Sequence, residues 1–240
     1  MKQLALDFAI APPPTLENFA AGRNAELLQH LRWLTAGDLR ERSFYIWGGP
    51  GCGRSHLLRG MVAALRGAGS SAAYVACAPG AALPEGLDRL DGVALDDVDQ
   101  LDPDAQIAAF HLCNILREHQ GALVASGAAP PAQLRLREDL VTRLGWGLVF
   151  QVHALTDEEK ARALADRAAA RGFRLPPEVC EFLLARVRRD MPSLLEILDA
   201  LDRYSLQAKR PITVPLAREW LADRREAGIE DPGPRSRSRC

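Results

Sequence analysis

Apolar and polar residues follow two patterns along this chain, and the change comes near residue 154. Between residues 43 and 152, short apolar runs alternate with longer helical patterns, near 55–66 and 103–119. The apolar runs predict strands at 43–47, 72–77, 92–96, 121–125 and 147–152. Strands that alternate with helices indicate a largely parallel sheet, which binds ligands at the carboxyl ends of its strands.

After Thr156 the pattern is helical only, with helices predicted near 157–171, 176–189, 192–208 and from Pro215 to about 226. Thr156 and Glu159 have the spacing of a capping box. The predicted organisation has four parts: an N-terminal arm with a proline linker at 1–14, an α/β domain at 15–153, a helical domain at 154–226 and a disordered tail at 227–240.

A glycine-rich segment stands between the first predicted strand and its helix. Its glycines permit a tight turn in which N–H groups point at one anion, and the helix N-terminus adds positive charge. Arg54 stands where a phosphate loop carries lysine, and its planar fork is not interchangeable with an ammonium. We therefore predict a nucleotide site with slow hydrolysis, against the alternative of an ordinary turn. The predicted contacts are Gly48, Gly49, Pro50, Gly51, Cys52, Gly53, Arg54, Ser55 and His56, with the Ser55 hydroxyl on magnesium.

The third predicted strand ends in a run of acidic residues. Asp96 is the candidate that holds magnesium through water, and Asp97 the candidate that orients or activates the attacking water. Ser126, at the end of the fourth strand, is a candidate contact of the γ-phosphate, although a serine there is more often a turn residue. Asp102 before Pro103 is typical of a helix cap instead.

Composition excludes several classes of protein. The 240 residues carry a net charge of −1, so no overall basic field recruits nucleic acid. The five cysteines are scattered without metal-ligand spacing, so we expect neither a structural metal site nor a secreted disulfide framework. No apolar run approaches membrane-spanning length and no signal peptide is present, which indicates a cytoplasmic protein without membrane contact.

The N-terminal arm carries one polar and two apolar anchors at short spacing, in Gln3-Leu4-Ala5-Leu6-Asp7-Phe8. In extended form these side chains suit a groove on a partner, and the prolines that follow favour a semi-rigid spacer. The spacing resembles the Q-x-x-L-x-F peptide by which many bacterial replication proteins hold the sliding clamp. Gln3, Leu4, Leu6 and Phe8 are therefore the predicted clamp contacts, with an edge strand or a frayed terminus as the alternative.

Residues 15 to about 226 resemble the AAA+ core of the bacterial replication initiator DnaA, and most closely its shorter relative, the Hda-type regulatory inactivator. The segment from Thr15 to Phe19 resembles the adenine-side entry segment, which implies that Phe19 lies near the base. Asp96 and Asp97 match the acidic pair of the family. The segment Arg143-Leu144-Gly145-Trp146-Gly147 resembles the one that carries the arginine finger, whereas position alone would suggest an ordinary surface arginine.

The resemblance implies an α/β fold, an AAA+ P-loop NTPase core with a parallel sheet, followed by a small all-α lid. Two departures from the initiator stand out. Pro192 occupies the place of a phosphate-contacting arginine in the lid, with Arg188 or Arg189 as alternatives. The sequence ends after the lid, so specific origin binding is not expected.

The function implied is that of a nucleotide-bound regulator, with ADP expected over ATP and with Mg²⁺. Together with the DNA-loaded sliding clamp, the β subunit of DNA polymerase III, it stimulates ATP hydrolysis by DnaA and so negatively regulates replication initiation. Its partners are the clamp and DnaA, its DNA contact is indirect through the clamp, and its place is at the replisome in the cytoplasm. Arg143 serves as arginine finger in trans, and the chain itself turns over ATP poorly. Self-association stays open, as do a free-standing AAA+ ATPase that remodels or loads a replication partner and a non-catalytic adaptor.

Overall fold

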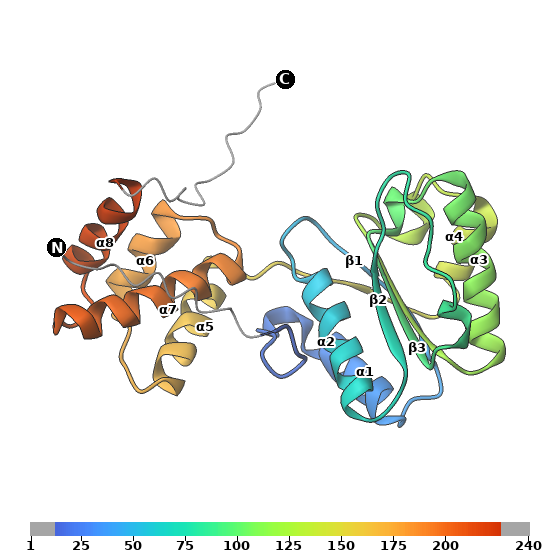
Figure 1. The fold of residues 1–240 in the computed structure, drawn as a ribbon, viewed down its shortest axis with the longest axis horizontal. Helices are drawn as coiled ribbons and strands as arrows, with labels where there is room; N and C mark the ends of the chain where they lie inside the picture. The colour runs from blue at the N-terminus through green and yellow to red at the C-terminus, as the bar shows by residue number, and fades with distance from the viewer. Residues whose placement is uncertain (1–12, 227–240) are drawn as a thin grey trace, which may run out of the picture. The chain divides into compact units, whose positions relative to one another are not determined.

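The computed structural model describes residues 13–226, which form a parallel α/β unit and a helical unit (Figure 1). The chain divides into these two compact units between residues 154 and 155. Each unit has its own hydrophobic core, as expected of parts that fold independently.

The first unit is built on a sheet of five parallel strands in the order β2-β3-β4-β1-β5. The strands are β1 (Ser43–Trp47), β2 (Ala72–Ala76), β3 (Gly92–Asp96), β4 (Ala122–Gly127) and β5 (Leu148–Gln151). In a parallel sheet the residues that follow β1, β3 and β4 gather at one edge, which we call the carboxyl edge. The residues that precede β1 and β5 gather at the opposite, amino edge.

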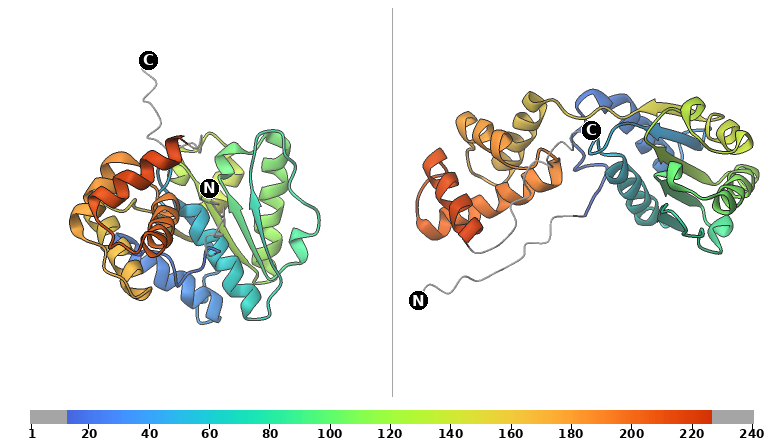
Figure 2. Two further views of the ribbon diagram at one scale, coloured as in Figure 1. Left: turned by 60° about the vertical axis from the view of Figure 1, so that its left-hand side comes forward. Right: turned by 90° about the horizontal axis from the view of Figure 1, so that it is seen from above.

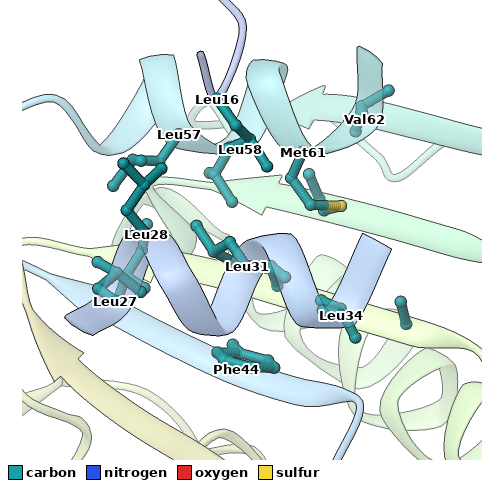
Figure 3. Close-up of a cluster of buried hydrophobic side chains, with 14 of the residues drawn as sticks. Leu16, Leu27, Leu28, Leu31, Leu34, Phe44, Leu57, Leu58, Met61 and Val62 are labelled. Carbon is teal, nitrogen blue, oxygen red and sulfur yellow. The ribbon is translucent and has the colours of Figure 1, made fainter. Parts of the chain in front are cut away.

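Two pairs of helices cover the two faces of this sheet (Figures 1 and 2). Helices α1 (Ala25–Ala36) and α2 (Arg54–Gly67) lie on one face, and α3 (Pro103–Glu118) and α4 (Glu138–Leu144) on the other. Figure 3 shows the core on the α1 and α2 side, where leucines of both helices point toward one another above Phe44 of β1. Asp102 caps α3 as expected, and its carboxylate accepts the N–H of Ala105 at 2.9 Å.

The second unit consists of four helices around a separate core. They are α5 (Asp157–Ala170), α6 (Pro177–Arg186), α7 (Met191–Ala208) and α8 (Val214–Glu226). The capping box of Thr156 and Glu159 is present, as the spacing predicted. Helix α6 ends three residues before the expected 189, because Val187 is extended and Asp190 already caps α7.

The parallel sheet and the helical second unit agree with the expected fold class. The sequence did not predict α4 as a helix. This helix has only seven residues, or about two turns, and buries only Leu140 and Leu144. A periodic pattern needs more length to be recognised. The fourth strand continues beyond the expected end at 125, since Ser126 and Gly127 pair with Ile46 and Trp47.

Candidate functional site

The glycine-rich segment joins β1 to α2 in a tight turn at the carboxyl edge. Gly51 and Gly53 have φ angles of 75° and 107°, in the left-handed region that glycine enters without steric cost. A Cβ at Gly53 would also lie 2.7 Å from the ring of Phe19. Helix α2 begins at Arg54, so N–H groups of its first turn lack intrahelical acceptors and are available to an anion.

The entry segment is fixed to the start of α2 through His56. Its Nε2 lies 2.8 Å from Asn18 Oδ1 and 3.0 Å from the carbonyl oxygen of Thr15. Burial lowers the pKa of His56, which favours the neutral ring that donates from Nε2. The rings of His56 and Phe19 lie 5.5 Å apart. The structure thus brings Phe19 and the loop together, and the contact of Phe19 with a base stays a prediction.

Asp96 is buried at the end of β3, with 3% of its surface exposed. Its carboxylate accepts hydrogen bonds from Ser126 Oγ at 2.5 Å and from the Tyr74 hydroxyl at 2.7 Å. The Ser126 oxygen in turn accepts the N–H of Asp97 at 3.0 Å. Ser126 therefore ties two strand ends together, and its predicted contact with phosphate stays untested. Tyr74 escaped the sequence analysis because its nearness depends on the pairing of β2 with β3.

Arg54 and Asp97 form an ion pair across the site, with 2.8 Å between Nη2 and Oδ1. The Arg54 side chain is only 12% exposed, and its Nη1 is buried without a hydrogen-bond partner. An unpaired buried guanidinium nitrogen is costly, and a phosphate oxygen is an acceptor that would satisfy it. Burial raises the pKa of Asp97, although the charge of Arg54 opposes the shift. Asp97 also has a left-handed φ of 56°, which is uncommon outside glycine.

The donor set fits a magnesium nucleotide. The loop N–H groups and the free Nη1 of Arg54 suit phosphate oxygens, and the Ser55 hydroxyl and the Asp96 carboxylate are oxygen ligands of the kind magnesium prefers. Within residues 13–226, no group of three or more His, Cys, Asp or Glu side chains is placed to hold a metal ion. A magnesium ion at this edge would therefore need phosphate oxygens and water as further ligands.

Arg143 lies on α4, near the amino edge of the sheet. Its Nε donates to Asn114 Oδ1 at 2.7 Å, and its guanidinium lies 3.5 Å from the ring centroid of Trp146 and 5.2 Å from that of Phe110. Asn114 and Phe110 stand four residues apart on α3 and so share one face of that helix. Of these residues the sequence indicated only Arg143, because no sequence pattern predicts that α3 packs against α4.

Arg143 is remote from the loop of its own chain. It precedes β5, whereas the loop follows β1, and these two strands run parallel. A strand of five residues spans about 17 Å, which is the approximate distance between the two edges. Gly147 marks the amino edge, because a Cβ there would overlap the backbone carbonyl of Ser43, the first residue of β1.

The alternative arginines of the lid are both engaged within the helical unit. Arg188 forms an ion pair with Asp190 at 3.0 Å. Arg189 donates to the carbonyl oxygen of Leu184 at 2.9 Å and contacts Asp157 at 3.3 Å. Pro192 lies in the first turn of α7, where it needs no N–H partner. A phosphate contact by Arg188 or Arg189 would require these lid contacts to be exchanged.

Several expectations concern residues that the structure does not describe. The predicted clamp contacts Gln3, Leu4, Leu6 and Phe8 lie outside the described residues, as does the tail at 227–240. Among the described residues, no helix combines the length and apolar character needed to cross a membrane.

Comparisons with known proteins agree on the nature of both units. A model of the Hda lid domain matches residues 157–221. An uncharacterized protein of Haemophilus influenzae is 37% identical over 228 residues, which cover 92% of this chain and 98% of that protein. Domain III of the Thermotoga maritima replication initiation protein DnaA superimposes with a TM-score of 0.69 at 20% identity, over 89% of this chain and 98% of that chain. AMPPCP-bound DnaA from Aquifex aeolicus has a TM-score of 0.65 at 22% identity, over 80% of this chain and 66% of that chain. The predicted fold class, an AAA+ core followed by a helical lid, is confirmed.

Proposed function

Because the chain belongs to the Hda-type, DnaA-related AAA+ family, we propose that it is a nucleotide-bound regulator of replication initiation. Family and fold support a regulatory role toward DnaA in general. The finer proposal is that the chain, held on the DNA-loaded sliding clamp, stimulates hydrolysis of the ATP bound to DnaA. It thereby switches the initiator off, and it holds ADP while it does so.

The carboxyl edge supports the binding of a nucleotide. The glycine-rich turn, the start of α2 and the unsatisfied Nη1 of Arg54 offer donors to phosphate oxygens. Ser55 and Asp96 would hold the magnesium ion, whose role is to neutralise charge on the phosphates. DnaA of the same fold binds the nucleotide analogue AMPPCP. Nucleotide binding by this chain follows as part of the proposal.

The same edge argues against rapid turnover by the chain itself. Asp97 is the residue proposed to orient the attacking water, yet its carboxylate pairs with Arg54 at 2.8 Å. One oxygen of the Asp97 carboxylate is thus committed to Arg54 and is not available to orient water. A nucleotide would therefore be bound more readily than it is hydrolysed.

The observation that carries the proposal is the position of Arg143. Its guanidinium is oriented by Asn114 and by the Trp146 ring, at the edge of the sheet opposite its own loop. An arginine that is separated from its own phosphate loop by the length of a strand, about 17 Å, can neutralise transition-state charge only on a nucleotide held by another molecule. We assign Arg143 that role, with ATP-bound DnaA as the partner.

The test is single-round hydrolysis of ATP preloaded on DnaA, with the chain added in the presence and absence of DNA-loaded clamp. A variant with Gln3→Ala, Leu6→Ala and Phe8→Ala examines the arm, which is proposed to bind the clamp. A second variant with Lys2→Ala and Asp7→Ala serves as matched control, because it changes the arm outside the proposed contacts.

We expect acceleration that requires the clamp, is lost in the triple variant and persists in the control variant. Acceleration that is independent of the clamp would contradict the role of the arm. No acceleration by a folded, nucleotide-bound chain would overturn the regulatory function. Magnesium-dependent ATPase activity of the chain alone, lost on Asp97→Asn, would then favour a free-standing ATPase.

A further inference from the structure

A hollow of about 540 Å³ opens at the amino edge of the sheet, where α1 ends, β1 begins and α3 ends. Three arginines line it, Arg40, Arg42 and Arg117, together with a single acidic residue, Glu41. We call this hollow the basic pocket. Its lining comes from two segments far apart in the sequence, residues 37–43 and 117–120, so Arg117 joins Arg40 and Arg42 only in the folded chain.

The positive charge of the basic pocket is not neutralised by the surrounding fold. Nε of Arg42 is buried without a hydrogen-bond partner. The Glu41 carboxylate accepts the N–H of Ser43 at 2.8 Å, which commits one of its oxygens to the backbone. Among the ion pairs of residues 13–226, none involves the three arginines of the basic pocket.

The carboxyl group of Asp91 interacts electrostatically with Arg42. The two hydrogen bonds that the Asp91 carboxylate accepts from Ser71 at 2.7 Å lower its pKa, and the charge of Arg42 contributes to the same shift. Asp91 does not line the basic pocket. A buried guanidinium nitrogen without an acceptor is costly, so a carboxylate or another anion that enters the pocket would be stabilised there.

The basic pocket continues into the surface that presents Arg143. The guanidinium of Arg117 lies 4.6 Å from the ring centroid of Trp146, the same ring that Arg143 contacts at 3.5 Å. Trp146 is 45% exposed and so remains available to a partner. A molecule that receives Arg143 would therefore also lie close to Arg117, which lines the basic pocket.

We propose that the basic pocket docks an acidic segment of the nucleotide-bearing partner protein, whose carboxylates pair with Arg40 and Arg42 while Arg143 reaches the nucleotide. This inference rests on the proposed function. Nucleic acid fits less well, because none of the residues that line the pocket is an aromatic on which a base could stack. A confined hollow also differs from the extended basic track that follows a nucleic-acid backbone.

The experiment compares the wild-type chain with a double variant, Arg40→Gln and Arg42→Gln. The matched control is Arg32→Gln with Arg89→Gln, which removes two exposed arginines of the same unit outside the pocket. The single variant Arg40→Gln is included because this side chain is exposed, so its replacement should disturb the fold least. Thermal unfolding verifies that each variant is folded. The chain is titrated into single-round hydrolysis of ATP on DnaA with DNA-loaded clamp.

The double variant should raise the half-saturating concentration of the chain by about three- to tenfold and leave the maximal rate unchanged, because it weakens docking and spares Arg143. The single variant should show a smaller rise in the same direction, and the control none. An unchanged half-saturating concentration, with acceleration intact, overturns the docking site and leaves the proposed function standing.

Direct binding of the chain to ATP-bound DnaA separates the two proposals if the wild type does not accelerate hydrolysis. Weaker binding by the double variant then supports the docking site although the proposed function has failed, and equal binding overturns the docking site as well. The last measurement is the binding of each variant to a fluorescent DNA oligonucleotide. Loss of DNA binding in the double variant, with affinity for DnaA unchanged, overturns the inference in favour of nucleic acid.

Discussion

The two edges of the parallel sheet surround their arginines differently. At the carboxyl edge Arg54 pairs with Asp97, and the buried Asp96 is satisfied by two hydroxyl groups. At the amino edge Arg143 donates to a neutral amide and lies against an aromatic ring, and Arg42 keeps a buried nitrogen unpaired. Each edge leaves one buried guanidinium nitrogen unpaired, Nη1 of Arg54 and Nε of Arg42, but only Arg54 has a carboxylate partner within the described residues.

This difference separates two kinds of binding. A ligand at the carboxyl edge finds Nη1 of Arg54 free but shares the guanidinium with Asp97, which already pairs with Nη2. A ligand at the amino edge meets guanidinium groups that have no carboxylate partner in the described residues. A carboxylate of the ligand would therefore be their first ion-pair partner. The carboxyl edge therefore suits a nucleotide, whose phosphate would satisfy Nη1 of Arg54, and the amino edge suits a second protein.

The largest expected effect comes from Arg143→Ala, which removes the cation that the amino edge offers. The maximal rate of hydrolysis on DnaA should fall by about 10³-fold or more, as for other arginine fingers supplied in trans. The affinity of the chain for ADP, measured by calorimetry, should not change. If the rate is maintained while affinity for ADP falls, the two edges do not divide these roles.

Arg143→Lys is the control for charge alone. Lysine keeps the positive charge but lacks the planar fork that donates to Asn114 and lies over Trp146. We expect most of the activity to remain lost. Full activity of the lysine variant would contradict a role for the orientation of the guanidinium.

The second prediction concerns the packing that builds the amino edge. Gly147→Ala should destabilise the α/β unit by about 3 kcal/mol, because its Cβ would overlap the backbone of Ser43. Gly145→Ala is the matched control, since its nearest neighbour would be the Val141 carbonyl oxygen at 3.5 Å, an ordinary contact. Urea denaturation followed by tryptophan fluorescence measures both. Equal stability of the two variants would show that the strand β5 can move away from β1.

The two edges also differ in how far they could be predicted from the sequence. The residues of the carboxyl edge lie in short sequence segments. The glycine-rich turn with Ser55 follows one apolar run, and Asp96 and Asp97 come at the end of another. Strand endings in a parallel sheet meet at one edge, so their proximity followed from the pattern alone. What the pattern could not supply was the ion pair of Arg54 with Asp97, which depends on side-chain geometry.

The amino edge depends on contacts between helices and on strand order. Arg143 was identified through the family resemblance, but Asn114 and Phe110 lie earlier in the chain, on α3 rather than α4. The basic pocket requires Arg117 to approach Arg40 and Arg42, and no spacing in the sequence predicts that approach. Long-range packing therefore decided what sequence periodicity left open.

The third prediction tests the competition at the carboxyl edge. Asp97→Asn removes the charge that pairs with Arg54 and lies near the proposed phosphate position, so affinity for ADP should rise about tenfold, or about 1.4 kcal/mol. Intrinsic hydrolysis should not rise with it. Titration calorimetry with ADP and magnesium measures the affinity. A tenfold loss instead would mean that Asp97 holds Arg54 in the position that binds phosphate.

The smallest expected effect is a pH dependence that belongs to the carboxyl edge. Burial places the pKa of His56 below its ordinary value of 6.5, so the unfolded chain takes up this proton first as the pH falls. The contribution of His56 to the free energy of unfolding is therefore complete above pH 6.5 and is lost as the pH falls below it. Because the ring is only partly buried, the loss should be at most about 1 kcal/mol.

His56→Gln isolates this contribution, because glutamine keeps a donor toward Asn18 and Thr15 but does not titrate. The free energy of unfolding is measured by urea denaturation at about pH 7.5 and about pH 5.5. The wild type should lose more stability than the variant over this interval, since only the wild type must exclude a proton from the ring. Parallel losses would show that the entry segment releases His56 before it is protonated, and that the ring does not couple Phe19 and the loop to pH.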